Sequence, residues 1–255
     1  LQQPNGVGLM LPAVAAVFLA WFVWLLATQC DSEERGKMSA LFFLIVISTV
    51  FWSMFEQSGG SMTLFADRAT DLTLFGMELT AAQFGSANAI FIILLSPLFA
   101  LMWPALLSNN IEPSTPAKFG LGIVQVGLGF GALLIGLNNP DSAGLVSAWW
   151  LVLAYFLHTS AELCLSPIGL SAVTKLSIAR YVGVMMGAWF LASAYGSYLA
   201  SELAIFFSSI GGEDGRLDNS GFNALFTELL MYGVGVGIAV LLVSPLVRRL
   251  MKDVR

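Results

Sequence analysis

Long apolar segments, separated by short polar ones, run through the whole chain. A helix needs about 20 apolar residues to cross the hydrocarbon core of a bilayer. Seven segments reach that length, approximately 9–29, 39–63, 82–107, 118–137, 147–173, 181–208 and 222–247. Residues 64–81 form an amphiphilic stretch in which we expect a short interfacial turn. The pattern predicts an all-α membrane protein with seven spanning helices.

The composition supports this class. Hydrophobic residues make up 57% of the chain and charged residues only 11%, whereas soluble domains carry about 25% charged residues. The basic residues form no stripe with interleaved aromatic residues, so nucleic acid is not an expected partner. Cys30 and Cys164 fit the role of small apolar fillers better than that of metal ligands. We expect no metal or other cofactor.

The distribution of basic residues predicts the orientation of the spans. If the C-terminal tail is cytoplasmic, nine of the eleven bases lie in cytoplasmic segments, which the positive-inside rule favours. These nine are Arg35, Lys37, Lys118, Lys175, Arg180, Arg248, Arg249, Lys252 and Arg255. Only Arg68 and Arg216 then lie outside. Seven spans place residue 1 outside, and since Leu1 is not a start methionine we expect the sequence to be part of a longer protein.

Two glutamates lie inside predicted spans, where a charged side chain costs roughly 3 kcal/mol even on a lenient insertion scale. Glu56 follows Trp52 by four residues in the second span, and Glu162 lies in the fifth. Intramembrane carboxylates mark proton or substrate sites by default. For Glu56 the alternative is a carboxylate that snorkels to the membrane interface.

Glu162 belongs to a polar helix face. Tyr155, Thr159, Glu162 and Ser166 recur at i, i+4, i+7 and i+11, which is one side of a helix. Lipid cannot satisfy such a face, so it must look towards other helices or a wet cavity. A hydrogen-bond network between helices is the alternative, but a glutamate is expensive for packing alone, and the pattern therefore favours a cavity.

The remaining polar side chains leave more than one interpretation open. His158 precedes Glu162 by four residues, so it either pairs with that carboxylate or is structural. Asn88 has equal reason to bond a neighbouring helix or a ligand. Trp189 lies among apolar residues, which favours packing. A serine hydrolase is disfavoured, because His158 and Ser166 lie about 12 Å apart along one helix and no G-x-S-x-G motif is present.

Glycines four residues apart occur in three spans. Such spacing lets helix backbones approach closely, so we expect each pair to mark a contact between helices. The pairs are Gly127 and Gly131, Gly183 and Gly187, and Gly233 and Gly237.

Two segments that contain these polar residues resemble motifs of a known family. Residues 51–68, FWSMFEQSGGSMTLFADR, resemble the F-W-x-x-F-E-Q-x-G-x-S-x-x-x-F-A segment of proton-dependent oligopeptide transporters. Residues 162–171, ELCLSPIGLS, resemble the E-L-x-L-S-P-x-G-L-S segment of the same family, and residues 182–191 are similar to its following helix. The resemblance extends from the first span to the last.

The resemblance implies the carboxy-terminal six-helix bundle of a major-facilitator fold plus one preceding extra helix. Residues 1–30 would form the extra transmembrane helix and 31–38 a cytoplasmic linker. Residues 39–247 would form the six-helix bundle and 248–255 a cytoplasmic tail. A multi-pass protein of the inner (cytoplasmic) membrane is expected.

The resemblance also implies a function, namely proton-coupled symport of di- and tripeptides by alternating access. Proton coupling would involve Glu56 and Glu162, with Glu162 facing the amino terminus of the peptide. The substrate-binding residues implied by the resemblance are Trp52, Asn88, Glu162, Ser166 and Trp189.

One family motif is absent. The E-x-x-E-R-F-x-Y-Y motif belongs to the other half of the fold, as do the basic and tyrosine residues expected to bind the peptide carboxylate. We therefore expect an amino-terminal six-helix half as a partner. Two other functions stay open: a major-facilitator transporter of nitrate or a drug-like solute, and a non-transporting membrane sensor subunit. Glu162 argues against an anion carrier.

Overall fold

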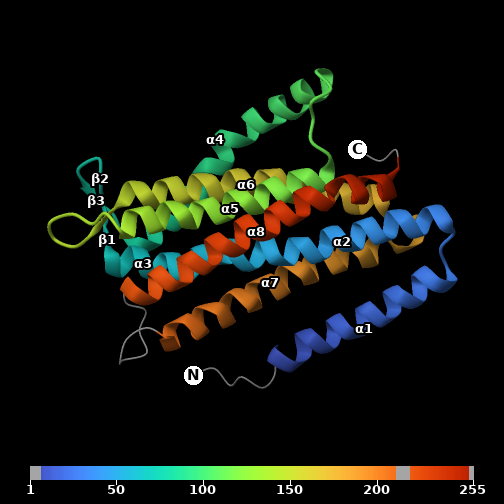
Figure 1. The fold of residues 1–255 in the computed structure, drawn as a ribbon, viewed down its shortest axis with the longest axis horizontal. Coiled ribbons are helices and arrows are strands. Elements are labelled where there is room, and N and C mark those ends of the chain that lie inside the picture. Colours follow the sequence, from blue (N-terminus) through green and yellow to red (C-terminus); the bar gives the residue numbers. More distant parts are fainter. Residues whose placement is uncertain (1–6, 211–218, 253–255) are drawn as a thin grey trace.

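The seven predicted spans are helices in a computed structural model that describes residues 7–210 and 219–252 (Figure 1). Each helix is long and apolar enough to cross a membrane. They are α1 (Val7–Thr28), α2 (Ser32–Phe55), α4 (Ala81–Ser108), α5 (Thr115–Leu137), α6 (Ala148–Leu176), α7 (Val182–Ile210) and α8 (Asn219–Met251). The prediction of an all-α membrane protein is confirmed. The polar residues 211–218 and the end of the predicted tail, 253–255, lie outside the described residues.

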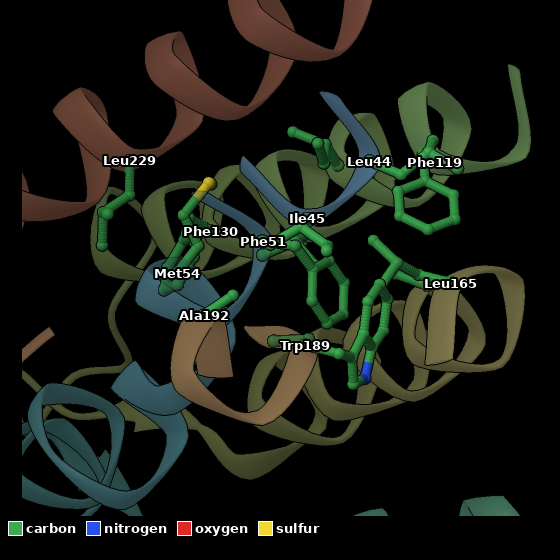
Figure 2. Close-up of a cluster of buried hydrophobic side chains, with 14 of the residues drawn as sticks. Leu44, Ile45, Phe51, Met54, Phe119, Phe130, Leu165, Trp189, Ala192 and Leu229 are labelled. Atoms are coloured by element: carbon green, nitrogen blue, oxygen red, sulfur yellow. The ribbon is translucent and has the colours of Figure 1, made fainter. Parts of the chain in front are cut away.

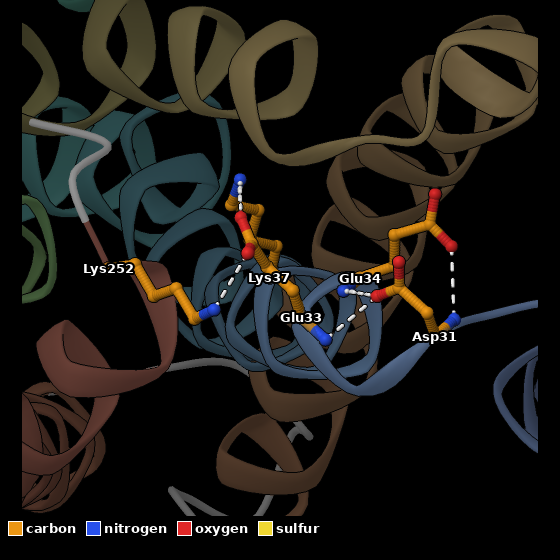
Figure 3. Close-up of polar contacts among 5 residues, drawn as sticks. All are labelled: Asp31, Glu33, Glu34, Lys37 and Lys252. Atoms are coloured by element: carbon orange, nitrogen blue, oxygen red, sulfur yellow. Dashed lines mark hydrogen bonds and ion pairs between the residues drawn. The ribbon is translucent and has the colours of Figure 1, made fainter.

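The segment predicted as a cytoplasmic linker, 31–38, is helical from Ser32 onward, so α2 begins before the predicted span at residue 39. Asp31 caps α2: its Oδ1 accepts hydrogen bonds from the backbone N–H groups of Glu33 and Glu34, both at 2.8 Å (Figure 3). Glu34 reciprocates by accepting from the Asp31 N–H at 3.1 Å, which completes a capping box. Acidic side chains accept hydrogen bonds from the free backbone N–H groups of a first helical turn. The polar composition of 31–38 therefore did not indicate a loop.

The α-helix of the second span also ends earlier than predicted, at Phe55. A 3-10 turn, η1 (Glu56–Gly59), follows α2, and the nine-residue helix α3 (Ser61–Ala69) begins after Gly60. Gly60 has φ −112° and ψ −100°, which is far from helical geometry. The break matters because it falls at Glu56.

Four short strands cover the end of the bundle that carries α3. Strands β1 (Thr70–Asp71) and β4 (Val146–Ser147) pair in parallel and tie the loop before α4 to the loop before α6. Strands β2 (Thr73–Leu74) and β3 (Met77–Glu78) form an antiparallel hairpin. The amphiphilic stretch 64–81 therefore holds the end of α3 and this hairpin.

The helices form a bundle whose centre is α2, α5, α6, α7 and α8. Helix α5 packs along both α8 and α6, and α2 packs along α7. Figure 1 shows α1 at one edge of the bundle and α4 leaning away from it at the other. The apolar core joins the central helices through side chains such as Phe51, Phe119 and Leu165, which are fully buried (Figure 2).

Glycines bring α5 and α8 into backbone contact. A Cβ added to Gly233 would lie 2.5 Å from the Gly127 Cα, and one added to Gly237 would lie 2.9 Å from the Gly120 carbonyl oxygen. The expectation of close helix contact holds for these positions. It was wrong for Gly183 and Gly187, where a Cβ would meet nothing within 4 Å.

Basic residues gather at one end of the bundle. Figure 1 places the α1–α2 connection and the C-terminal end of α8 together at that end, opposite α3 and the strands. Lys252 at the end of α8 pairs with Glu33 at 2.7 Å, and Glu33 also pairs with Lys37 at 2.8 Å (Figure 3). This separation of bases from the end that carries Arg68 agrees with the predicted orientation, which itself stays a prediction.

Replacement of Gly233 by alanine tests the α5–α8 contact. The added methyl group would force the two backbones apart, and overpacking of this kind costs about 1–3 kcal/mol. We expect a lower Tm for Gly233→Ala in detergent. The matched control is Gly235→Ala on the same helix, where a Cβ meets nothing within 4 Å. A Tm equal to that of the parent in both variants would contradict the proposed importance of this contact.

Cysteine labelling in intact cells tests the orientation. Ser32 and Ser142 are both exposed and lie at opposite ends of the bundle, whereas the native Cys30 and Cys164 are buried. A membrane-impermeant maleimide should label Ser142→Cys readily and Ser32→Cys only after the cells are permeabilised. The reverse pattern would overturn the predicted topology.

Candidate functional site

The polar face of α6 is bonded to α4 through Asn88. The Asn88 Nδ2 atom donates to Thr159 Oγ1 at 3.1 Å and to Glu162 Oε2 at 3.0 Å, using both of its hydrogens. Thr159 is fully buried, while Glu162 and Asn88 are half-buried. Asn88 therefore bonds a neighbouring helix, one of its two predicted roles, and it fixes the Glu162 carboxylate between α4 and α6.

Glu56 occupies the break between α2 and α3. It is the first residue of η1, is half-buried, and lines a pocket of about 440 Å³ together with Gln57, Gly60, Ser197 and Ala200. The pocket lies between the η1 turn and α7. A carboxylate at a helix end has more freedom to reach a cavity than one held on a continuous helix.

The two candidate carboxylates lie on neighbouring elements, Glu56 on η1 and Glu162 on α6. The η1 turn also touches α6 directly, because the Tyr155 hydroxyl donates to the Ser58 carbonyl oxygen at 3.3 Å. Residues that the sequence separates by about a hundred positions are thus brought together at one place. Two like charges repel each other, so protonation of either carboxylate would remove the repulsion that acts on the other.

Trp52, on α2, packs against α7. Its half-buried indole lies beside Phe51 and Phe55, and its Cβ faces Gly196, where an added Cβ would come within 2.6 Å of it. The Trp52 Nε1 atom is buried and has no hydrogen-bond partner among the described residues. An indole N–H is a donor that usually finds a partner when buried, so Trp52 carries an unused donor.

His158 has the structural role that was one of its two predicted interpretations. Its Nε2 atom lies 3.1 Å from the Val126 carbonyl oxygen on α5, and the ring packs against Phe130 and Phe55. Since a carbonyl can only accept, Nε2 carries the proton. The His158 ring packs directly against Gly129, where an added Cβ would lie 2.5 Å from the ring. The absence of a side chain at Gly129 therefore makes room for the ring. This bond ties α6 to α5 and does not involve Glu162.

Ser166 and Trp189 differ in how well they fit the predicted cavity. Ser166 is half-buried, about one turn beyond Glu162 on α6. Trp189 is only 2% exposed and sits in the apolar core, against Phe119 and over Gly169 (Figure 2). In this structure Trp189 is packed in the core, as the packing interpretation expected, and its role in substrate binding stays a prediction.

Sequence reasoning missed Gln57 and the serines of α7. Gln57 is 1% exposed and bonds both α7 and α3. Ser193, Ser197 and Ser201 are spaced four apart on α7, and the last two line the pocket beside Glu56. The spacing was a readable signal, but nothing in the sequence indicated which helix that face would meet. Among the described residues, no cluster of three or more histidine, cysteine or acidic side chains could hold a metal ion.

These features define a multi-pass helical membrane protein of the major-facilitator type, with two carboxylates gathered inside the bundle. The chain belongs to the POT family, whose sequence profile matches residues 8–217. The resemblance to proton-dependent oligopeptide transporters is thereby confirmed. Members of this family are transporters, which excludes the hydrolase alternative.

Named relatives agree. The chain is 37% identical over 249 residues to "Peptide transporter YePEPT" of Yersinia enterocolitica, covering 96% of this chain and 47% of that protein. It is 31% identical to a "Di-/tripeptide transporter" of Lactococcus lactis, covering 98% of this chain and 48% of that one. A solved peptide transporter POT in complex with sulfate has a TM-score of 0.83 at 33% identity, over 98% of this chain and 50% of that one. The chain thus spans about half the length of the relatives it matches.

Proposed function

We propose that this chain supplies one half of a proton-coupled symporter of di- and tripeptides, which works by alternating access. A second, amino-terminal six-helix half completes the cavity, and the protein lies in the inner (cytoplasmic) membrane with its C-terminus in the cytoplasm. The printed names of the relatives support peptides as the substrate class. The match to about half of each relative supports the need for a second half.

The observation that carries the proposal is that the Glu162 carboxylate is held by Asn88 and still has room to accept further hydrogen bonds. An ionised carboxylate offers about four acceptor positions, and Asn88 takes one of them at 3.0 Å. The carboxylate is held in place yet keeps acceptor capacity on a half-buried face. A peptide ammonium group is a strong donor that fits this capacity. The peptide carboxylate then needs a positive charge, which we assign to the other half.

Proton coupling follows from the pair of glutamates. Glu56 on η1 and Glu162 on α6 lie on elements that contact each other, so the arrival of an ammonium at Glu162 changes the electrostatic environment of Glu56. This provides a physical link between the substrate and the proton. The link requires that the η1 turn and α6 stay in contact, as they are through Tyr155 and Ser58.

The alternatives fit less well. A carboxylate on the polar face repels nitrate and other anions. A non-transporting sensor has no need for two ionisable groups within the spans, each of which is expensive. Glu162 by itself would also suit a drug-like cation. Comparing the binding of a free-amine dipeptide with that of an N-acetylated dipeptide distinguishes a peptide substrate from such a cation.

Replacement of Glu56 by glutamine tests proton coupling. In the complete transporter reconstituted in liposomes, Glu56→Gln should abolish peptide uptake driven by a proton gradient, because an amide cannot take up and release a proton. Counterflow exchange, which needs no net proton movement, should survive. Glu202→Gln on α7 is the matched control, since Glu202 is exposed. Normal gradient-driven accumulation by Glu56→Gln would exclude Glu56 from coupling.

Replacement of Glu162 by glutamine tests recognition of the peptide amino terminus. Loss of a hydrogen bond between charged groups costs about 1.5–3 kcal/mol, which is roughly a ten- to hundredfold loss of affinity. We expect Glu162→Gln to weaken binding of a free-amine dipeptide by this factor. An N-acetylated dipeptide should bind the parent poorly and lose little more in the variant. Equal losses for both ligands would show that Glu162 does not contact the ammonium group.

A further inference from the structure

Gln57 is the most completely bonded side chain of the η1 turn. Its Nε2 atom donates to the Ala200 carbonyl oxygen on α7 at 3.0 Å, and its Oε1 atom accepts from Ser61 Oγ on α3 at 2.7 Å. The residue is 1% exposed. A buried amide is costly unless both of its ends are bonded, and here one amide joins η1 to two other helices.

This bonding fixes where the neighbouring carboxylate lies. Glu56 and Gln57 are consecutive in η1, and both line the pocket whose opposite wall is formed by Ser197, Ala200 and Ser201 of α7. The Ala200 carbonyl that receives the Gln57 amide therefore belongs to the wall that Glu56 faces. Because this bond holds η1 against α7, it sets the distance between the Glu56 carboxylate and the pocket wall. The electrostatic energy of the carboxylate depends on that distance.

We propose that Gln57 is a positioning residue for proton coupling, which holds the η1 turn against α7 so that Glu56 faces the α7 pocket. The proposal rests on the proposed function. A neutral amide suits this role, because it donates and accepts at once without adding a charge beside Glu56. An ionised glutamate at this position has no hydrogen to donate to Ala200.

Other titratable groups surround the turn and stay unchanged in the test. On α6, α7 and α3, which contact η1, they include Tyr155, His158 and Glu162 of α6, Tyr195, Tyr198 and Glu202 of α7, and Asp67 and Arg68 of α3.

Gln57→Met in the complete transporter tests the proposal, because methionine has similar length and no strong donor or acceptor. We expect the pH at which gradient-driven uptake is half-maximal to move by about half a pH unit or more, since Glu56 loses its fixed surroundings. Counterflow exchange should stay within about twofold of the parent, because it requires no net proton movement. The matched control is Gln125→Met, which removes another half-buried amide, on α5, whose oxygen accepts from Ser160 at 3.3 Å.

Gln57→Glu separates hydrogen bonding from bulk. A protonated glutamate keeps both bonds, so this variant should match the parent at acidic pH. At alkaline pH the ionised glutamate loses the bond to Ala200 and adds a negative charge beside Glu56, so its uptake should depart from the parent at least as far as that of Gln57→Met. If Gln57→Met does not insert, Ser61→Ala decides, because it removes one of the two bonds and leaves the bulk of Gln57 in place. It should move the pH profile in the same direction by a smaller amount.

A parent-like pH profile in Gln57→Met, or in Ser61→Ala where that variant decides, would overturn the role of Gln57 alone. Absence of proton-driven peptide uptake in the parent would instead overturn the proposed function, and the role of Gln57 with it.

Discussion

Hydrocarbon offers no hydrogen bonds, so a polar group inside the spans is costly unless it finds a partner within the protein. This constraint explains the most specific contacts of the bundle. The forked donation from Asn88 joins α4 to α6, the bond from His158 to Val126 joins α6 to α5, and the amide of Gln57 joins η1 to α7 and α3. Each contact both satisfies a polar group and decides which helix faces which.

Apolar packing supplies the rigid frame around these contacts. Glycines let α5 and α8 touch at their backbones, and Phe119 and Phe130 fill the space towards the neighbouring helices. Helix α4 contributes few buried side chains, Phe84 and Leu95, and leans away from this frame. The hydrogen bonds from Asn88 attach α4 to α6, and one of them holds the Glu162 carboxylate.

The break after Phe55 gives the site its second carboxylate. A continuous helix would have carried Glu56 along a straight span, whereas the 3-10 turn places it on a pocket beside α7. Contacts from α6 and α7 then hold the turn on two sides, through Tyr155 and Gln57. The site is thus built where regular helix geometry ends, in a segment whose backbone is fixed by side chains of other helices.

The sequence by itself determined the class, the seven spans and the family, and it singled out Glu56 and Glu162 as candidates, because length, hydropathy and the cost of a buried charge are local properties. It also indicated the shared face of Tyr155, Thr159 and Glu162, which follows from helical periodicity. It did not reveal that 32–38 is helical, since a capping box and a loop have similar composition. Nor did it distinguish Trp189 in the core from a cavity residue, or the glycines of α5 and α8 from Gly183 and Gly187. Only the tertiary structure decided these points and the bonding partners of Gln57, because each depends on which helix lies opposite, and that is set by packing between segments far apart in the chain.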